Sequence, residues 1–484
     1  ADPKNKGGWR IIVAIADVAY YVPPGSALDK GAAARGNSVY LPDRVVPMLP
    51  ERLSNGLCSL REGEDRPCLA VEMIFNKSGR KRGHKFLRAI MRSAVKLSYE
   101  EAQTAFDGAP CATAAPFAKD VLAPLYSAYK ALVKAREARS PLDLDMPERR
   151  IVFKDGKVDG VKLRDRFDAH RLIEECMIQA NVAAAETLEA ARLPFIYRVH
   201  DEPDPEKLEA ARDYLQSIGY PFAKGQVVTA KTFNEILAKA KERDESELAG
   251  LVVLRSQCQA VYTTDNAGHF GLNLRRYAHF TSPIRRYADL TVHRALIKAC
   301  KLGSDGAKDI DAEALEETAQ TISNFERRAM AAERDSVDRF MAAWLQDRVG
   351  AEFDARIAGV TRFGVFVRLE ETGADGLIPI RTLGTEYYRH EEAVHALVGE
   401  TTGRAYRLGQ KVRVRLEEAT PVAGGLVFDM LSPPGPAPKT RKSSGRKGRG
   451  RKDAGRKSGA RKGKSRKGGA SKRGRAPGGG KSRR

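Results

Sequence analysis

Residues 269–294 of the 484-residue chain read HFGLNLRRYAHFTSPIRRYADLTVHR, a stretch that combines arginines with aromatic residues. The arginines are Arg275, Arg276, Arg285, Arg286 and Arg294, and the aromatic residues among them are Phe270, Tyr277, Phe280 and Tyr287. Guanidinium groups bind phosphate through paired N–H donors, and the start of a helix also attracts anions. Ser282 and Pro283 predict such a start, with serine as the cap and proline in the first turn. The stretch therefore indicates a phosphate site, although an amphipathic helix with a solvated basic face has the same composition.

The residues before this stretch change from strand patterns to helix patterns. Residues 9–22 are apolar and β-branched and predict a buried strand, while residues 67–76 and 86–97 predict two paired strands. A short helix is predicted at 26–36 and a β segment at 37–47. Helical spacing recurs at residues 99–106, 120–139, 170–192, 205–218, 229–245 and 312–345. The patterns together predict an α+β body.

After Gly350 the sequence changes to short alternating strands with glycine turns. These are EFDARIAGVTRFGVFVRLEETGADGLIPI at 352–380 and KVRVRLEEATPVAGGLVFDML at 411–431. Such spacing is typical of a small five-stranded barrel of the OB type. Phe363 and Phe366 lie near a glycine in a strand pattern, so they are either stacking surfaces for nucleobases or core residues.

Charge is concentrated at the C-terminus. The chain carries a net charge of +22, and residues 433–484 hold 21 of its 84 Lys and Arg with a single acid, Asp453. The preceding body is therefore nearly neutral, and the Lys/Arg/Gly-rich tail is predicted to be disordered. The tail is either a binding segment for a polyanion, with strongly salt-dependent affinity, or a solubilising extension without a specific partner.

Several classes of protein are excluded by composition. The six cysteines are too scattered for a disulfide framework, and neither a CxxC pair nor an HExxH motif indicates zinc. The longest apolar runs are far shorter than a bilayer span, so no membrane partner is predicted.

Residues 269–294 resemble the signature of the RNB family of exoribonucleases, which includes ribonucleases II and R. The same resemblance extends to residues 14–73, beginning AIADVAYYVPPGSALDK, and to LIEECMIQANVAAAETL at 172–188. The strands at 352–431 resemble the S-one RNA-binding domain, and the order of the parts is that of the ribonuclease R branch. We therefore expect a partial RNB catalytic domain at 1–347, an S-one domain at 348–432 and the tail at 433–484.

The resemblance implies a function as well as a fold. It implies processive 3′→5′ hydrolysis of single-stranded RNA to nucleoside 5′-monophosphates, in RNA turnover in the bacterial cytoplasm. The alternatives are a non-catalytic RNA-binding pseudo-ribonuclease and a ribosome-associated RNA-binding protein. Single-stranded RNA is the expected partner, with the ribosome or structured RNA as a further partner for the tail.

The resemblance also implies roles for individual residues. Arg285 matches the arginine that holds the scissile phosphate, and Glu333 matches a glutamate beside the 3′ nucleotide; these two are the implied catalytic residues. Tyr40 matches a tyrosine that clamps the last base, and Glu174 matches an acid near the terminal ribose. The other implied RNA-binding residues are Arg286, Tyr287, Phe363, Phe366, His390 and Arg413. A second clamping aromatic is expected around Pro141–Asp145, where this sequence has only Leu142 and Leu144.

The family's reaction requires Mg²⁺ held by a cluster of aspartates. That D…D-x-D-D segment lies upstream of the strand at 9–22 in the family and has no counterpart after Ala1. Asp17 and the Asp143/Asp145 pair do not match it, so no metal ligand is assigned in this chain. We expect the C-terminal portion of such an enzyme, truncated at its N-terminus, which binds single-stranded RNA and hydrolyses it negligibly by itself.

Overall fold

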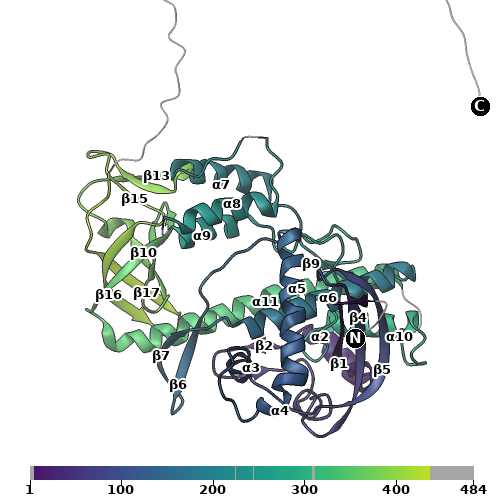
Figure 1. Cartoon of the computed structure of the whole chain (residues 1–484). Helices are drawn as coiled ribbons and strands as arrows, with labels where there is room; N and C mark the ends of the chain where they lie inside the picture. The colour runs from purple at the N-terminus through teal and green to yellow at the C-terminus, as the bar shows by residue number, and fades with distance from the viewer. Residues whose placement is uncertain (1–4, 224, 244, 308–310, 437–484) are drawn as a thin grey trace, which may run out of the picture. The chain divides into compact units, whose positions relative to one another are not determined.

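The computed structural model describes residues 5–223, 225–243, 245–307 and 311–436, which form a mixture of helices and strands (Figure 1). A mixed body precedes a closed barrel of five strands. This arrangement confirms the predicted fold class for the described residues.

An antiparallel sheet of three strands lies near the N-terminus. Its strands are β1 (Trp9–Ala16), β4 (Asp65–Phe75) and β5 (Lys81–Arg92), in the order β1–β4–β5. The predicted pairing of the second and third of these strands is confirmed. Ile11, Val13 and Ile15 alternate along β1 and are buried in the core, as the two-residue period of a strand requires.

The first strand is shorter than predicted. β1 ends at Ala16, and the helical turn α1 (Val18–Tyr21) occupies the second half of the predicted strand. Asp17 causes the change, because its carboxylate accepts the backbone N–H of Tyr20 and also pairs with Arg88 Nε at 2.5 Å. A capping side chain of this kind ends a strand and begins a helix.

Two helices complete the core over this sheet. α6 (Asp168–Ala190) packs on β1 and β4, and α10 (Tyr287–Ala299) packs on α6 and α1. The other helices of this region are α2 (Ala27–Arg35), α3 (Tyr99–Phe106), α4 (Ala115–Phe117) and α5 (Ala123–Arg139). Short strand pairs are β2 (Val39–Tyr40) with β3 (Val45–Val46), and β8 (Tyr197–Val199) with β9 (Val261–Thr263).

The helix start predicted at Ser282 and Pro283 is wrong. α10 begins at Tyr287, and the residue before it, Arg286, is extended with φ −136° and ψ 125°. The N–H of Ser282 donates to Asp289 Oδ1 at 2.7 Å, which holds residues 282–286 as a loop in front of the helix. The Ser-Pro pair therefore opens a single turn, in which the N–H groups of Arg285 and Arg286 donate to the carbonyl of Ser282, and the helix begins only after it.

Three helices form a separate small core. They are α7 (Pro205–Ser217), α8 (Ala230–Lys241) and α9 (Ser246–Ser256), and they bury Tyr214, Leu215 and Phe233 among others. The hydroxyl of Tyr214 donates to the backbone carbonyl of Leu408 at 2.8 Å.

The barrel consists of five strands in the closed order β10–β11–β12–β17–β16. Their bounds are β10 (Glu352–Thr361), β11 (Gly364–Leu369), β12 (Asp375–Pro379), β16 (Lys411–Thr420) and β17 (Gly425–Met430). Beside it lies a second sheet that the sequence did not predict, with strands β13 (Tyr388–Glu391), β14 (Ala396–Gly399) and β15 (Ala405–Arg407). A hairpin of β6 (Arg149–Lys154) and β7 (Lys157–Leu163) was also not predicted.

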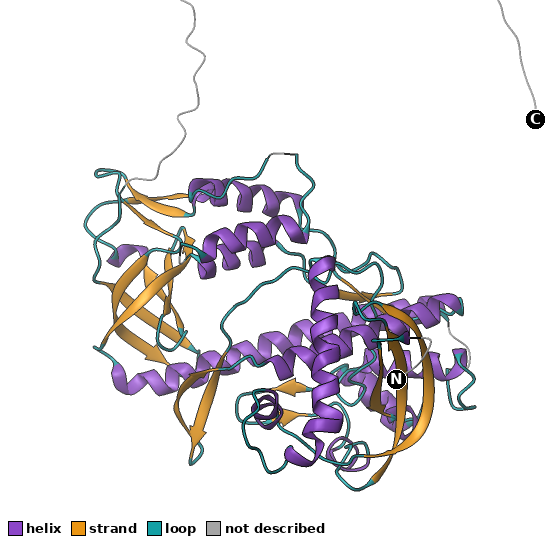
Figure 2. Cartoon of the chain, viewed as in Figure 1, coloured by secondary structure: helices purple, strands orange, loops and turns teal. Residues whose placement is uncertain are grey.

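The long helix α11 (Ala312–Leu345) coincides with the predicted helix at 312–345. Its 34 residues span about 51 Å at the rise of an α-helix. Ala319 and Ile322 pack in the first core, while Met341 and Leu345 pack in the core of the barrel. Figure 2 shows this helix as a continuous purple ribbon from the body to the barrel.

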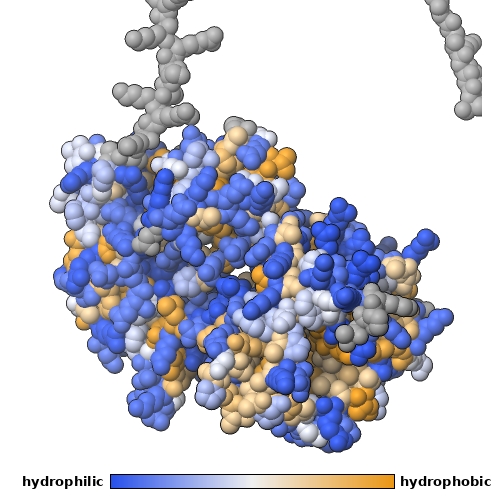
Figure 3. Space-filling view, in the orientation of Figure 1, coloured by the Kyte–Doolittle hydropathy of each residue, from blue (hydrophilic) through white to orange (hydrophobic). Residues whose placement is uncertain are grey.

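The remaining predictions concern the C-terminal tail, the cysteines and membrane-spanning helices. Most of the tail predicted to be disordered, residues 437–484, lies outside the described residues. All six cysteines are in the described part of the chain and are free thiols. Within that part, no helix is both long and apolar enough to cross a membrane, and the face seen in Figure 3 is mainly hydrophilic.

Gly79 in the β4–β5 turn offers a test of this packing. Its φ is +74°, and an added Cβ would collide with the carbonyl oxygen of Ala131 in α5. We expect Gly79→Ala to lower the free energy of unfolding by about 3 kcal/mol, from the strained φ and the clash together. Gly156→Ala in the β6–β7 turn is the control, because its φ is +76° and its Cβ would meet open space. Urea denaturation measures both free energies of unfolding. Equal decreases for the two variants would contradict the close packing of Gly79 against α5.

Candidate functional site

Three segments that are distant in sequence, together with Tyr262 of β9, meet at one pocket of about 220 Å³. They are the stretch that leads into β2, the loop before α10, and the middle of α11. The lining residues are Gly36, Asn37, Ser38, Tyr40, Tyr262, Arg285, Arg286, Ala288, Ile322, Glu326, Ala329, Met330 and Glu333. The pocket therefore brings together three residues that the sequence singled out, namely Tyr40, Arg285 and Glu333.

Backbone hydrogen bonds fix the walls of this pocket to one another. The N–H of Ser38 donates to the carbonyl of Arg285 at 3.0 Å, and the N–H of Tyr287 donates to the carbonyl of Gly36 at 2.8 Å. Glu333 Oε1 accepts the backbone N–H of Tyr40 at 2.8 Å. The strand that carries Tyr40 is thus held on one side by the arginine loop and on the other by α11.

The two adjacent arginines of the loop have different environments. Arg286 donates to both oxygens of Asp289, at 2.7 and 2.8 Å, and Asp289 is fully buried. Burial alone would lower the pKa of Arg286, but the Asp289 carboxylate raises it above its ordinary value. Arg285 is exposed, and its guanidinium has no ion-pair partner among the described residues. Arg286 therefore holds the loop, and Arg285 is the cation available to a ligand.

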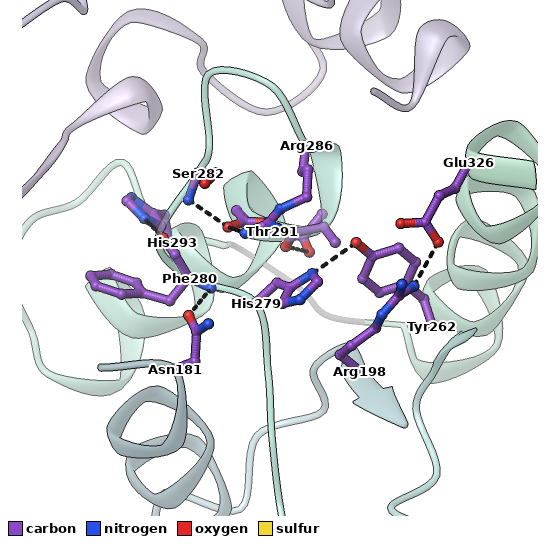
Figure 4. Close-up of polar contacts among 12 residues, drawn as sticks. Asn181, Arg198, Tyr262, His279, Phe280, Ser282, Arg286, Thr291, His293 and Glu326 are labelled. Carbon is purple, nitrogen blue, oxygen red and sulfur yellow. Dashed lines mark hydrogen bonds and ion pairs between the residues drawn. The ribbon is translucent and has the colours of Figure 1, made fainter. Parts of the chain in front are cut away.

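A polar network supports the floor of the pocket (Figure 4). The hydroxyl of Tyr262 and Nδ1 of His279 are 2.9 Å apart, and Arg198 donates to Glu326 at 2.6 Å while its guanidinium lies over the Tyr262 ring. Burial, and then the charge of Arg286, hold the pKa of His279 well below its ordinary value, so its ring is neutral. The network fixes Tyr262 without adding a free charge to the pocket.

The sequence did not identify several of these lining residues. Glu326, Met330 and Glu333 lie on one face of α11 at helical spacing, so the first two follow from the third once the helix is recognised. Tyr262 and Asn37 carry no comparable signal, because they reach the pocket through long-range packing.

The aromatic residues of the arginine-rich stretch do not form a stacking surface. Phe280 and Tyr277 are buried, and the hydroxyl of Tyr277 accepts a hydrogen bond from the side-chain amide of Asn181. Tyr287 is 8% exposed, and its hydroxyl donates to Asp29 at 2.8 Å. The prediction that Tyr287 contacts RNA does not fit this position, because its ring is part of the core. Tyr40, in contrast, is 47% exposed.

Glu174 lines a different pocket from Arg285. This second pocket is about 330 Å³ in volume, and its residues are Tyr129, Val133, Arg136, Glu137, Ser140, Pro141, Asp143, Arg166, Arg171, Glu174, Glu175 and Asn234. Glu174 pairs with Arg136 at 3.4 Å and with Arg166 at 3.1 Å. Leu142 and Leu144, the residues at the expected second clamp, pack against the core of α7–α9.

The barrel presents aromatic side chains to solvent. Phe363 is 63% exposed and Phe366 is 41% exposed, so neither is a core residue. The guanidinium of Arg362 lies 4.7 Å from the centre of the Phe363 ring. Arg413 is exposed and pairs with Glu352 at 2.9 Å, whereas His390 belongs to β13 in the neighbouring sheet. Phe363 and Phe366, rather than Arg413 or His390, are the side chains of this region that are exposed and free to contact a ligand.

Within the described residues, no three His, Cys, Asp or Glu side chains come together as a metal site. Asp17 is engaged with Arg88 and the start of α1. Asp143 lines the second pocket, and Asp145 lies 3.8 Å from Arg166. The acidic residues present do not fit the ligand set of a catalytic Mg²⁺.

Comparisons with known proteins place this geometry in context. A family model described as RNB domain matches residues 1–301, and one described as S1 RNA binding domain matches residues 346–430. Ribonuclease R of Escherichia coli strain K12 is 40% identical over 442 residues, covering 89% of this chain and 54% of that protein. Ribonuclease R of Aquifex aeolicus is 40% identical over 416 residues, covering 85% and 58%. The chain spans about half the length of these curated relatives.

A solved structure shows the same fold. It is that of Mycoplasma genitalium RNase R in complex with ribose methylated single-stranded RNA, and it superimposes with a TM-score of 0.81 at 28% identity. The match covers 87% of this chain and 67% of that one.

Asp289 allows a test of the loop. We expect Asp289→Ala to lower the free energy of unfolding by about 3–5 kcal/mol, because it leaves the guanidinium of Arg286 without its buried partner. The control is Asp335→Ala, which removes an exposed ion pair with Arg339 and should cost less than about 1 kcal/mol. Chemical denaturation of both variants measures the difference, and similar small losses would show that the buried pair does not hold the loop.

Proposed function

The chain belongs to the RNB family of exoribonucleases, and from that premise we propose that its pocket receives the 3′ end of single-stranded RNA. The family reaction at this end is 3′→5′ hydrolysis, which releases nucleoside 5′-monophosphates. One observation carries the proposal: Arg285, Tyr40 and Glu333, from three distant parts of the chain, line the same pocket. The single-stranded RNA in the Mycoplasma genitalium RNase R complex supports this substrate class.

Arg285 is proposed to hold the last phosphodiester linkage. Its guanidinium is permanently charged and offers paired donors that match two phosphate oxygens. Asp289 is already paired with Arg286, and the two glutamates of the pocket, Glu326 and Glu333, bind Arg198 and the backbone N–H of Tyr40. Arg285 therefore has no ion pair among the described residues. In the family reaction the same contact stabilises the charge that develops on the linkage.

Tyr40 and Glu333 are proposed to act together at the 3′ end of the RNA. The half-exposed ring of Tyr40 is suited to stack on the terminal base. Glu333 Oε1 is occupied by the backbone N–H of Tyr40, so we assign Glu333 as a positioning residue and not as a group that touches RNA.

Mg²⁺ would supply the activated water of the family reaction when bound, but the described residues do not form its ligand set. We derive no step through the metal. For the 484 residues by themselves, we propose that they bind the 3′ end of RNA and hydrolyse it little. An RNA-binding pseudo-ribonuclease, the rival interpretation, would do the same.

The remaining assignments extend the RNA path beyond the pocket. We propose that Phe363 and Phe366 stack on bases at the barrel, with Arg362 beside them. A contact of Glu174 with ribose, the roles of His390 and Arg413, and a ribosome or structured RNA as partner of the tail stay predictions. The bacterial ribonucleases R among the relatives support a place in bacterial RNA turnover, and we propose the cytoplasm as its location.

A fluorescent base at the RNA terminus tests the pocket. A single-stranded oligoadenylate that ends in 2-aminopurine should lose fluorescence on binding, because the base stacks on Tyr40. Tyr40→Ala should abolish this quenching and weaken binding by about 1–3 kcal/mol, whereas Tyr40→Phe should retain it. Quenching that is unchanged in Tyr40→Ala would refute the end-binding proposal.

The same titration has matched controls. Arg285→Ala should raise the Kd obtained from the quenching titration about tenfold, as expected for loss of one charge-assisted contact. Arg275→Ala, which removes an exposed arginine outside the pocket lining, should stay within about twofold. With 2-aminopurine at the 5′ end, Tyr40→Ala should leave the fluorescence of the fully bound RNA unchanged.

A degradation assay separates binding from hydrolysis. We expect the purified chain with Mg²⁺ to bind 5′-labelled oligoadenylate and to produce no ladder of shortened RNA, because its described residues lack the acidic ligand group. Gel electrophoresis of the labelled RNA over time gives the answer. Rapid release of mononucleotides would contradict the proposed inactivity and would exclude the pseudo-ribonuclease interpretation.

A further inference from the structure

The β6–β7 hairpin, residues 149–163, has two faces of different chemistry. Its register pairs Arg150 with Lys162, and Lys154 with Lys157. Because side chains alternate along a strand, these four cations point to one face of the hairpin. Ile151 and Phe153 point to the other face.

The apolar face holds the hairpin in place. Ile151 and Val161 pack against the core that α11 shares with the barrel. The ring of Phe153 meets Phe340 of α11 edge to face, with 5.2 Å between the ring centres. Arg149 donates to the carbonyl of Glu370 at 3.2 Å and so fixes the base of the hairpin to the barrel. Figure 1 shows the hairpin beside α11.

The cationic face is free. Arg150, Lys154, Lys157 and Lys162 are all exposed, and none has an ion-pair partner among the described residues. Two acids of the hairpin, Asp155 in the turn and Asp159 at the bulge, are also exposed and pair with none of the four. The end of the hairpin, below α11 at the lower left of Figure 3, is correspondingly hydrophilic.

The hairpin lies on the continuation of the helix face that lines the pocket. Phe340 follows Glu333 by seven residues, which returns to nearly the same side of an α-helix about 10 Å further along its axis. A strand of RNA that leaves the pocket along this face of α11 therefore meets the hairpin where Phe153 covers Phe340, and from there it would pass over the opposite, cationic face. At about 3.4 Å per stacked nucleotide, the distance corresponds to about three nucleotides.

We propose that the cationic face of the β6–β7 hairpin binds the phosphates of single-stranded RNA about three nucleotides and more before the 3′ end. The proposal rests on the proposed function, since the RNA is the strand whose end occupies the pocket. A polyanion fits the hairpin better than a protein surface does, because this face offers four unpaired cations and only one partly exposed apolar side chain, Val152. Lysines suit this role, because they follow a flexible backbone without reading sequence.

Position-specific crosslinking tests the proposal in the full chain. A short single-stranded RNA carries one photoreactive 4-thiouridine, placed either at the 3′ end or at successive positions before it, and mass spectrometry identifies the crosslinked peptides. We expect the terminal position to label the peptide of Tyr40. Positions from about the third onward should label residues 149–163.

Charge variants provide the control. The combined variant R150Q/K154Q/K157Q/K162Q should lower the hairpin crosslink at least about fivefold and leave the terminal crosslink unchanged. The variant K77Q/R80Q/R82Q/K85Q removes the same charge from exposed positions of the β4–β5 hairpin and should change neither crosslink. If both variants lowered the hairpin crosslink equally, the RNA would be responding to total positive charge and not to this hairpin. That result would overturn the proposal.

The outcomes distinguish the hairpin from the pocket. A terminal crosslink at Tyr40 without any hairpin crosslink would overturn the hairpin assignment and leave the proposed function intact. Hairpin crosslinks of equal yield from every position, with none at Tyr40, would overturn both, because the RNA would then have no fixed register on the chain.

Discussion

The buried carboxylate of Asp289 is the constraint on which the rest of the site depends. It accepts the N–H of Ser282 and both donors of Arg286, and so it shapes the whole loop before α10. The loop then pairs through its backbone with the residues that lead into β2. Arg286 occupies this carboxylate, and the neighbouring guanidinium of Arg285 forms no ion pair among the described residues. A neutral residue at 286 would leave either a buried charge or a competing partner for Arg285.

The sequence predicted the elements whose patterns are local. The helix at 312–345 and the paired strands near 67–97 follow from periodicity, and the barrel follows from alternating strands with glycine turns. It failed where a side chain overrides the pattern, as Asp17 does at the end of β1 and Asp289 does at the predicted helix start. The sequence analysis also missed the sheet β13–β15, whose strands have only three or four residues, and the β6–β7 hairpin.

The predictability of the site divides in the same way. Arg285, Tyr40 and Glu333 came from a resemblance to a family, and the structure brings them to one pocket. The resemblance also implied an RNA contact for Tyr287, yet Tyr287 is a core residue together with Tyr277 and Phe280, because alternation of residue types does not determine which side chains face solvent. Tyr262 and Asn37 reach the pocket only through tertiary packing, for which the sequence has no signal. The distinction between a structural and an available arginine likewise required the position of Asp289.

Glu333 holds the main chain of residue 40 and not its ring. The anchor is therefore independent of which side chain residue 40 carries. A substitution at residue 40 can change or remove the ring that we propose stacks on the terminal base, without removing the hydrogen bond that holds the strand. The fit of the pocket to a terminal base can thus change while the walls of the pocket stay in place.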